Sequence, residues 1–212
     1  MKQILVVLAC LAALGTVPGP ARAESSTSDR QSLEQAAAIN TQLAVEYLKQ
    51  NNLKAARTVI DKALKQNPRT AETQMTAGLV YDRFGEDKKA LAFYNEAARL
   101  AKDNPEVLNN VAVYLCRKGD RKRGEELFQR AAASPLYKTP AVAMTNAGQC
   151  ALEDGRPKDA EQYFRKALTF RPDQPDTLLA LAGVTDDQGN NLQARAFLQR
   201  YLVTGLTAGA VK

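Results

Sequence analysis

The sequence predicts an all-α fold in which helical hairpins stack side by side into a solenoid. A pattern of small residues with an aromatic or aliphatic residue between them recurs every 34 residues, apart from two extra residues around Ser134 and Pro135. The composition favours helices, because Ala, Lys, Glu, Gln and Arg are abundant and tryptophan is absent. Each hairpin of such a solenoid buries its apolar face against its neighbours, so the chain needs no single large core.

The clearest copy of this pattern is the fourth. Gly148 stands on one predicted helix, and Ala160, Phe164 and Ala167 stand on the next. Two helices joined by a tight turn need small residues where they cross, and an aromatic ring fills the gap that remains. Pro172 ends the second helix, because proline disfavours the helical conformation of the residue before it. The other copies carry Ala44, Tyr47, Ala56, Ile60 and Ala63; Gly78, Tyr81, Ala90, Tyr94 and Ala97; Ala112, Gly124, Phe128 and Ala131; and Ala182, Ala194, Leu198 and Tyr201.

We therefore expect two helices in each of five units. They cover 33–50 and 53–66, 71–84 and 87–101, 105–118 and 121–133, 141–154 and 157–170, and 175–188 and 192–203. Ser32 and Gln35 form a capping box that begins the first helix. Gly85, Gly119 and Gly155 lie in turns, where glycine commonly ends a helix.

These elements place the repeat solenoid at 33–203. The segment 24–32 is rich in Ser, Thr and charged residues, so we expect a flexible leader there. The tail at 204–212 contains two glycines and has little helix propensity. Either this tail folds back as a poor cap or the array lacks a final unit.

Residues 1–23 are predicted to be a secretory signal peptide. An unbroken apolar run extends from Ile4 to Leu14, and Ala21-Arg22-Ala23 has the small-x-small pattern of a cleavage site. The run is too short to anchor the chain across a bilayer. A second interpretation is a lipobox at Val7–Cys10, which would acylate Cys10 and attach the protein to a membrane. The residues leave both processing sites open.

Catalytic and nucleic-acid chemistry is largely absent. There is no histidine, so the commonest general base and metal ligand is missing. Phosphate loops, nucleophile elbows and metal-binding Cys-x-x-Cys motifs do not occur. The net charge of +6 falls to +4 beyond residue 23, without the interleaved stacking aromatics typical of nucleic-acid binding. We expect no enzyme activity, no cofactor, no metal site and no nucleic-acid partner.

Two cysteines lie in neighbouring units. Cys116 and Cys150 fall in the first helices of units three and four, and an exported protein meets an oxidising compartment. A disulfide between them is one interpretation. The other is a pair of small buried thiols, because the two residues occupy different positions of the repeat that do not obviously face each other.

The period and pattern resemble the tetratricopeptide repeat. The tryptophan usual near the start of that motif is replaced by Asn40, Gln74, Leu108, Met144 and Leu178. The resemblance implies a right-handed superhelix with a concave surface. Positions two, five, nine, twelve and thirteen of each first helix line that surface, counted from Ala37, Ala71, Pro105, Ala141 and Pro175. In units three to five these positions hold Glu106, Asn109, Val113, Cys116 and Arg117; Val142, Thr145, Gln149, Leu152 and Glu153; and Asp176, Leu179, Gly183, Asp186 and Asp187.

Apolar residues at these positions in units one to three form the predicted protein-binding site: Val45, Leu48, Met75, Leu79 and Val113. A groove with such side chains can receive the apolar face of a partner peptide or helix. The alternative is that they pack against the leader or against each other. The basic turn at 117–123 is either a solvated turn or a contact for an acidic lipid or partner.

A narrower resemblance is to the type IV pilus biogenesis family of PilF/PilW pilotins. It rests on Leu43–Lys49 followed by Asn67-Pro68, on Thr145–Leu152, on Tyr163–Leu168 and on Ala194–Tyr201. Members of that family are outer-membrane lipoproteins with six repeats that help the secretin channel of the pilus to localise and assemble. This chain departs from the family in showing five units and a doubtful lipobox, which puts membrane anchoring in doubt.

The resemblance implies a non-enzymatic adaptor in the periplasm or at the periplasmic face of the outer membrane of a Gram-negative bacterium. Its implied partner is a pilus component, most plainly the secretin subunit. The alternative is a general periplasmic scaffold for another cell-envelope assembly machine. The oligomeric state and the partner's bound segment stay open.

Overall fold

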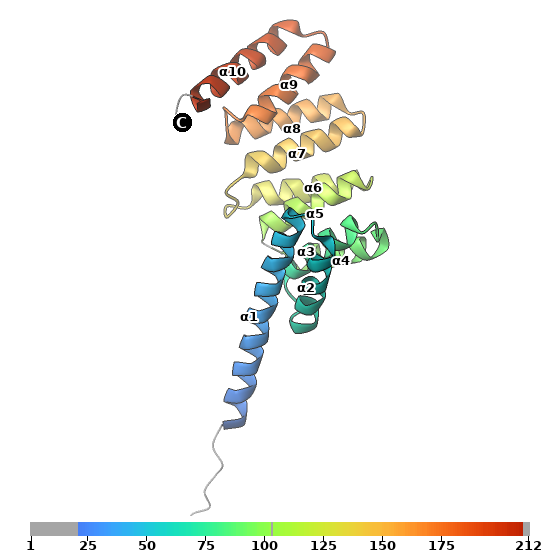
Figure 1. The fold of residues 1–212 in the computed structure, drawn as a ribbon. Helices are drawn as coiled ribbons and strands as arrows, with labels where there is room; N and C mark the ends of the chain where they lie inside the picture. The colour runs from blue at the N-terminus through green and yellow to red at the C-terminus, as the bar shows by residue number, and fades with distance from the viewer. Residues whose placement is uncertain (1–20, 103, 210–212) are drawn as a thin grey trace, which may run out of the picture.

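The computed structural model describes residues 21–102 and 104–209, which are entirely helical or in short connections. The helices are α1 (Ala21–Lys49), α2 (Leu53–Gln66), α3 (Ala71–Arg83), α4 (Asp87–Leu100), α5 (Pro105–Arg117), α6 (Arg121–Ala133), α7 (Pro140–Glu153), α8 (Pro157–Phe170), α9 (Pro175–Asp187) and α10 (Asn191–Gly209). Consecutive helices pair as five hairpins that stack in chain order, with α1 and α2 at one end and α9 and α10 at the other (Figure 1). The predicted all-α superhelix is confirmed.

The turns between paired helices are set by a few residues. Gly85, Gly119, Gly155 and Gly189 adopt positive φ angles of 70° to 92° at the ends of the first helices. Asn51, with φ 55°, takes this role in the first hairpin. Because only glycine and, less often, asparagine tolerate this left-handed conformation, these residues let each second helix return along the first.

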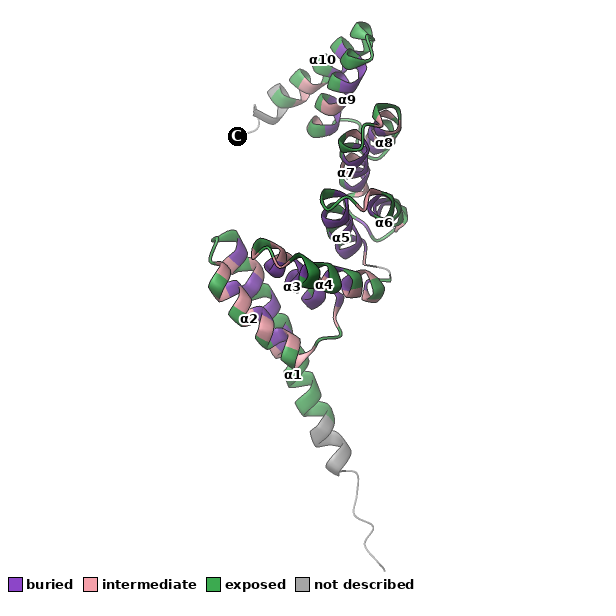
Figure 2. Ribbon diagram, turned by 90° about the vertical axis from the view of Figure 1, so that its right-hand side faces the viewer, coloured by how far each residue is buried: buried purple, intermediate pink, exposed green. Residues whose placement is uncertain are grey.

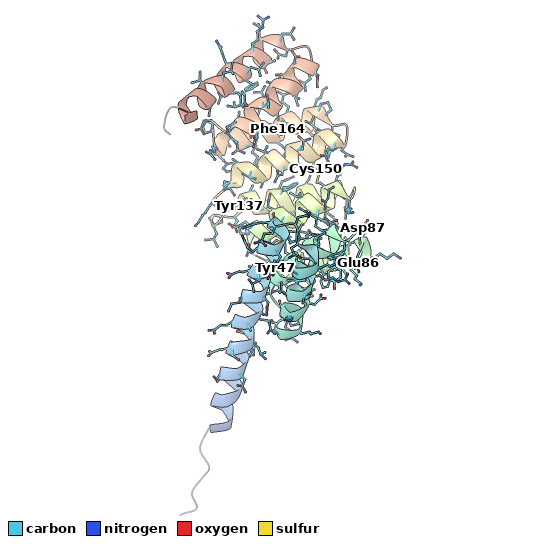
Figure 3. All side chains as sticks on the ribbon, in the orientation of Figure 1. Tyr47, Glu86, Asp87, Tyr137, Cys150 and Phe164 are labelled. Atoms are coloured by element: carbon cyan, nitrogen blue, oxygen red, sulfur yellow. A yellow bond between two sulfur atoms is a disulfide. The ribbon has the colours of Figure 1, made fainter. Side chains whose placement is uncertain are left out.

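Buried residues lie between the helices rather than at one centre (Figure 2). The largest fully buried side chains include Ile60, Phe128 and Phe164, which come from three different second helices. Small residues face them where the helices cross, as predicted. Figure 3 labels Phe164 on α8, whose ring packs against Gly148 of α7 so closely that a Cβ on Gly148 would lie 2.6 Å from Phe164 Cδ1.

The structure differs from the sequence-based expectation at both ends of the array. The segment 24–32 is part of α1, which runs for 29 residues without a glycine or proline to stop it. Ser32 therefore caps no helix start, and its hydroxyl donates to the Asp29 carbonyl oxygen (2.7 Å). The tail is helical as far as Gly209: α10 continues through Gly205, at a cost of about 1 kcal/mol, and ends at Gly209. The predicted signal peptide lies outside the described residues up to residue 20, and Ala21–Ala23 belong to α1.

The close crossing in the fourth hairpin gives a testable prediction. We expect Gly148→Ala to destabilise the protein by about 1–3 kcal/mol, because the added methyl group collides with the Phe164 ring. Gly183→Ala is the matched control: Gly183 also lies in a first helix, but its Cβ would meet nothing within 4 Å. Because alanine has a higher helix propensity than glycine, the control should be slightly more stable than the wild type. Thermal unfolding followed by circular dichroism measures both, and equal melting temperatures would contradict this account.

Candidate protein-binding surface

The structure places the five predicted binding residues in different environments. Leu48 is buried in the first hairpin, at 7% exposure, against Ala44, Ala56 and Ile60. Val45, Met75 and Leu79 are half-buried. Val113 is exposed, at 43% of its surface. The five residues therefore do not form one continuous open apolar strip, and Val113 offers the largest free surface among them.

Two of the half-buried residues take part in contacts between hairpins. Leu79 packs against the apolar clusters on both sides of α3. Met75 packs against the cluster that includes residues of α5, and its Sδ accepts a hydrogen bond from Asn110 Nδ2 (3.4 Å). The inner wall of the first three units is thus partly used to hold those units together. The repeat register assigns a residue to the concave surface, but it does not show whether that residue also packs against the neighbouring hairpin.

Val113 lines a groove of about 200 Å³ between α5 and α7, which we call the inner groove. Its lining residues are Val113, Cys116, Arg117, Phe128, Asn146, Gln149, Cys150 and Glu153. An arginine and a glutamate therefore accompany an apolar floor. Such a groove has space for one large apolar side chain, with polar or charged groups of the ligand on either side. The repeat register placed Arg117, Gln149 and Glu153 on the concave surface. They were not among the predicted binding residues, because only apolar side chains were selected there.

A disulfide joins Cys116 of α5 to Cys150 of α7, with a Cα–Cα distance of 5.7 Å. This decides between the two interpretations left open by the sequence. The rotation between successive hairpins brings the two repeat positions opposite each other, although they differ within an isolated helix. Small neighbours make room for the sulfur atoms, because a Cβ at Gly124 would collide with the Cys116 Sγ. The inner groove, which both cysteines line, therefore has a covalently fixed floor.

We expect loss of this disulfide to destabilise the protein. The bond closes a loop with a sequence separation of 34, for which chain entropy predicts about 3–4 kcal/mol. Thermal unfolding with and without dithiothreitol should show a lower melting temperature under reducing conditions. The double variant Cys116→Ala with Cys150→Ala serves as control and should melt at the same temperature in both buffers. An identical melting temperature of the wild type in both buffers would contradict the expected role.

The basic turn at 117–123 is largely engaged in ion pairs. Arg117 and Lys118 both bind Asp82 of the preceding hairpin, and Lys118 Nζ also lies 2.7 Å from an Asp87 oxygen. That hydrogen bond raises the pKa of Lys118 above its ordinary value. Arg121 binds Asp154 of the following hairpin (3.4 Å). These pairs indicate that the turn connects three hairpins, and they do not favour its interpretation as a contact for an acidic lipid or partner.

Ion pairs also connect the second helix of one hairpin to the turn within the next hairpin. Arg57 of α2 binds Glu86 (2.8 Å), and Glu125 of α6 binds Arg156. Arg156 also contacts Asp154 and Asp159, and its hydrogen bond to Glu125 is the largest cause that raises its pKa. Glu125 is nearly buried, so its charge is tolerable only because Arg156 neutralises it. The hairpins therefore meet in a specific register, which fixes the shape of the inner wall.

A second and larger groove lies between α9 and α10. It measures about 670 Å³, and we call it the terminal groove. It is lined by Leu179, Ala182, Gly183, Asp186, Asn191, Ala194, Arg195 and Leu198. Leu179, Gly183 and Asp186 were assigned to the concave surface by register, whereas Ala194, Arg195 and Leu198 come from the second helix of the last hairpin.

The described residues offer little else that is chemical. No group of three potential ligands among His, Cys, Asp and Glu is placed to hold a metal ion in 21–102 and 104–209. Within the same ranges, no helix combines the length and apolarity needed to cross a bilayer. Both the inner and the terminal groove contain residues that the repeat register assigned to the concave surface.

Comparison with known proteins identifies the repeat. Two profiles described as tetratricopeptide repeat match this chain, one at residues 41–105 and 112–175 and the other at residues 151–204. The type IV pilus assembly protein PilF of Pseudomonas aeruginosa is 29% identical over 167 residues. That match covers 77% of this chain and 65% of PilF, so just under two thirds of the relative is represented.

Two solved structures share the fold over most of the chain. The P. aeruginosa PilF structure has a TM-score of 0.73 and 24% identity, covering 82% of this chain and 78% of PilF. The structure of PilW, described as a widely conserved type IV pilus biogenesis factor, has a TM-score of 0.70 and 28% identity, covering 80% and 78%. The resemblance to the pilus biogenesis family found in the sequence is thereby confirmed.

Proposed function

Because this chain belongs to the tetratricopeptide repeat family, we propose that it is a non-catalytic adaptor of type IV pilus biogenesis that binds another protein. The similarity to PilF and PilW is the observation that carries this proposal, since it extends over about four fifths of the chain. The absence of histidine from the whole sequence agrees with a binding role rather than a catalytic one.

The inner groove is the proposed binding site. Val113 supplies its exposed apolar wall, Glu153 supplies a negative charge, and Arg117 supplies a half-exposed guanidinium that is paired with Asp82 on one side. A segment with one large apolar side chain between polar or charged residues fits this combination. The proposed partner is the secretin subunit of the pilus, whose assembly or localisation the adaptor promotes. Val45, Met75 and Leu79 are proposed to flank the bound segment with their exposed parts, while Leu48 supports them from the core.

The proposed location is the periplasm or the periplasmic face of the outer membrane. The charged start, the apolar run to Leu14 and the small residues at 21–23 support export. The Cys116–Cys150 disulfide adds independent support, because such bonds persist in oxidising compartments. Attachment through an acylated Cys10 remains part of the proposal only if cleavage occurs before that residue.

A general periplasmic scaffold for another envelope machine is the alternative function. Tetratricopeptide arrays serve unrelated machines, because their binding specificity lies in a few wall residues and not in the fold. A neighbourhood of pilus and secretin genes around this gene favours the pilus, whereas a neighbourhood of cell-wall or other outer-membrane assembly genes favours the alternative.

The proposal is tested by deleting the gene in the bacterium that carries it and restoring it with variants. We expect that Val113→Asp does not restore secretin multimers and surface pili, whose amounts stay near those of the deletion strain. The reason is that a carboxylate in the groove weakens partner binding by about tenfold or more. Leu136→Asp is the matched control, since Leu136 is 71% exposed and does not line the groove. Immunoblots check that both variants accumulate equally.

The outcomes separate the two functions. Full restoration by Val113→Asp would refute the inner groove as the secretin site. Normal pili and normal secretin multimers in the deletion strain would refute a pilus function altogether and leave the general scaffold as the better account.

A further inference from the structure

The two ends of the array expose residues at positions that every internal hairpin buries. At position three, Thr73, Val107, Ala143 and Thr177 are at most 2% exposed, because each lies against the preceding hairpin. Ile39 holds this position in α1, has no preceding hairpin in the structure, and is 57% exposed. Position seven repeats the contrast: Ala77, Val111, Ala147 and Leu181 are fully buried, whereas Leu43 is 42% exposed.

At the opposite end of the array, the residue at position five of the repeat lacks the neighbouring first helix to which its counterparts bond. In the first four hairpins this residue bonds to the next first helix, in the pairs Thr41–Thr73 (2.9 Å), Met75–Asn110 (3.4 Å), Asn109–Asn146 (3.1 Å) and Thr145–Thr177 (2.6 Å). Leu179 holds position five in α9 and is 49% exposed in the terminal groove. Leu198 of α10 is 41% exposed, whereas Phe164 at the same place in α8 is fully buried under α9.

We propose that these two ends bind each other, so that α1 of a second copy lies in the terminal groove and continues the stack. Ile39 and Leu43 of one copy would then meet Leu179 and Leu198 of the other, as Thr177 and Leu181 meet the fourth hairpin within one chain. The two surfaces lie at opposite ends of the molecule (Figure 1). One copy can therefore use both at once, and the contact is head to tail.

The charges at this junction follow those inside the chain. Asp186 of the terminal groove stands at position twelve, where Asp82 of the second hairpin binds Arg117 at position thirteen of the third. Lys49 holds position thirteen in α1, so it faces Asp186 of the other copy. In its own chain Lys49 contacts only the exposed Glu46 (3.0 Å) among the ion pairs of the described residues.

One position opposes the contact and limits its strength. Glu46 stands at position ten, where Val80, Tyr114, Cys150 and Val184 are buried in the internal junctions. Since the residue at position ten can reach position twelve of the preceding hairpin, as Cys150 reaches Cys116, Glu46 approaches the like charge of Asp186. The junction is therefore weaker than an internal one and reversible. Because a head-to-tail contact need not close on itself, it yields short chains whose length grows with concentration.

Analytical ultracentrifugation of the purified protein over a range of concentrations tests the proposal. We expect the wild type to form dimers and longer species as concentration rises. Leu43→Asp removes one end and Leu198→Asp removes the other, so each variant alone should weaken association by at least about tenfold. An equimolar mixture of the two variants retains one intact junction and should form dimers that grow no further.

Two further variants keep the test decisive. Leu192→Asp is the matched control on α10: Leu192 is 82% exposed, lies outside the terminal groove, and should associate like the wild type. Glu46→Val places at position ten the residue that Val80 and Val184 supply in other hairpins, and it should strengthen association about tenfold or more. Circular dichroism confirms that each variant is folded.

The opposite results would overturn the proposal. A wild type that stays monomeric at all concentrations, together with a monomeric Glu46→Val variant, excludes the contact. A mixture of Leu43→Asp and Leu198→Asp that remains monomeric while the wild type associates shows a contact of another geometry. Association of either single variant as strong as that of the wild type would also refute the assigned surfaces.

Discussion

Close crossing of helices within a hairpin is the constraint on which the rest of the structure depends. Where Gly148 faces Phe164, or Gly78 faces Tyr94, the two helices approach until a ring fills the space that a missing side chain leaves. Each hairpin then presents two nearly flat apolar sides, which only another hairpin can cover. Stacking, the shape of the inner wall and the exposure of both ends all follow from this local requirement.

The bonds between hairpins decide what the inner wall can offer to a partner. Met75 and Leu79 share their surface between neighbours and solvent, so a ligand reaches only part of each. At the junction of α5 and α7, by contrast, the disulfide and the Asn109–Asn146 hydrogen bond connect the helices, and Val113 is 43% exposed. The covalent joint thus lies beside the most exposed of the five predicted binding residues.

The repeat period was enough to predict the hairpins, because small residues, turn glycines and prolines recur at fixed spacing. The ends of the array could not be predicted in the same way. The segment 24–32 has a polar composition that resembles disorder, yet it continues α1 because nothing in it stops a helix. Likewise, the register that placed Leu48 on the inner wall could not show that α2 covers it, and the twist that aligns Cys116 with Cys150 is a property of the stack and not of either helix.

The joints between successive hairpins of this molecule are of three kinds. Paired hydroxyls connect the first two hairpins, a thioether and an amide the next, a disulfide the third pair, and hydroxyls again the last. Arginine and glutamate even exchange sides between the Arg57–Glu86 and Glu125–Arg156 pairs. A gene rearrangement that duplicated or swapped internal units would therefore bring mismatched surfaces together. Although the hairpins look interchangeable in outline, each one fits the neighbours that it has in this chain.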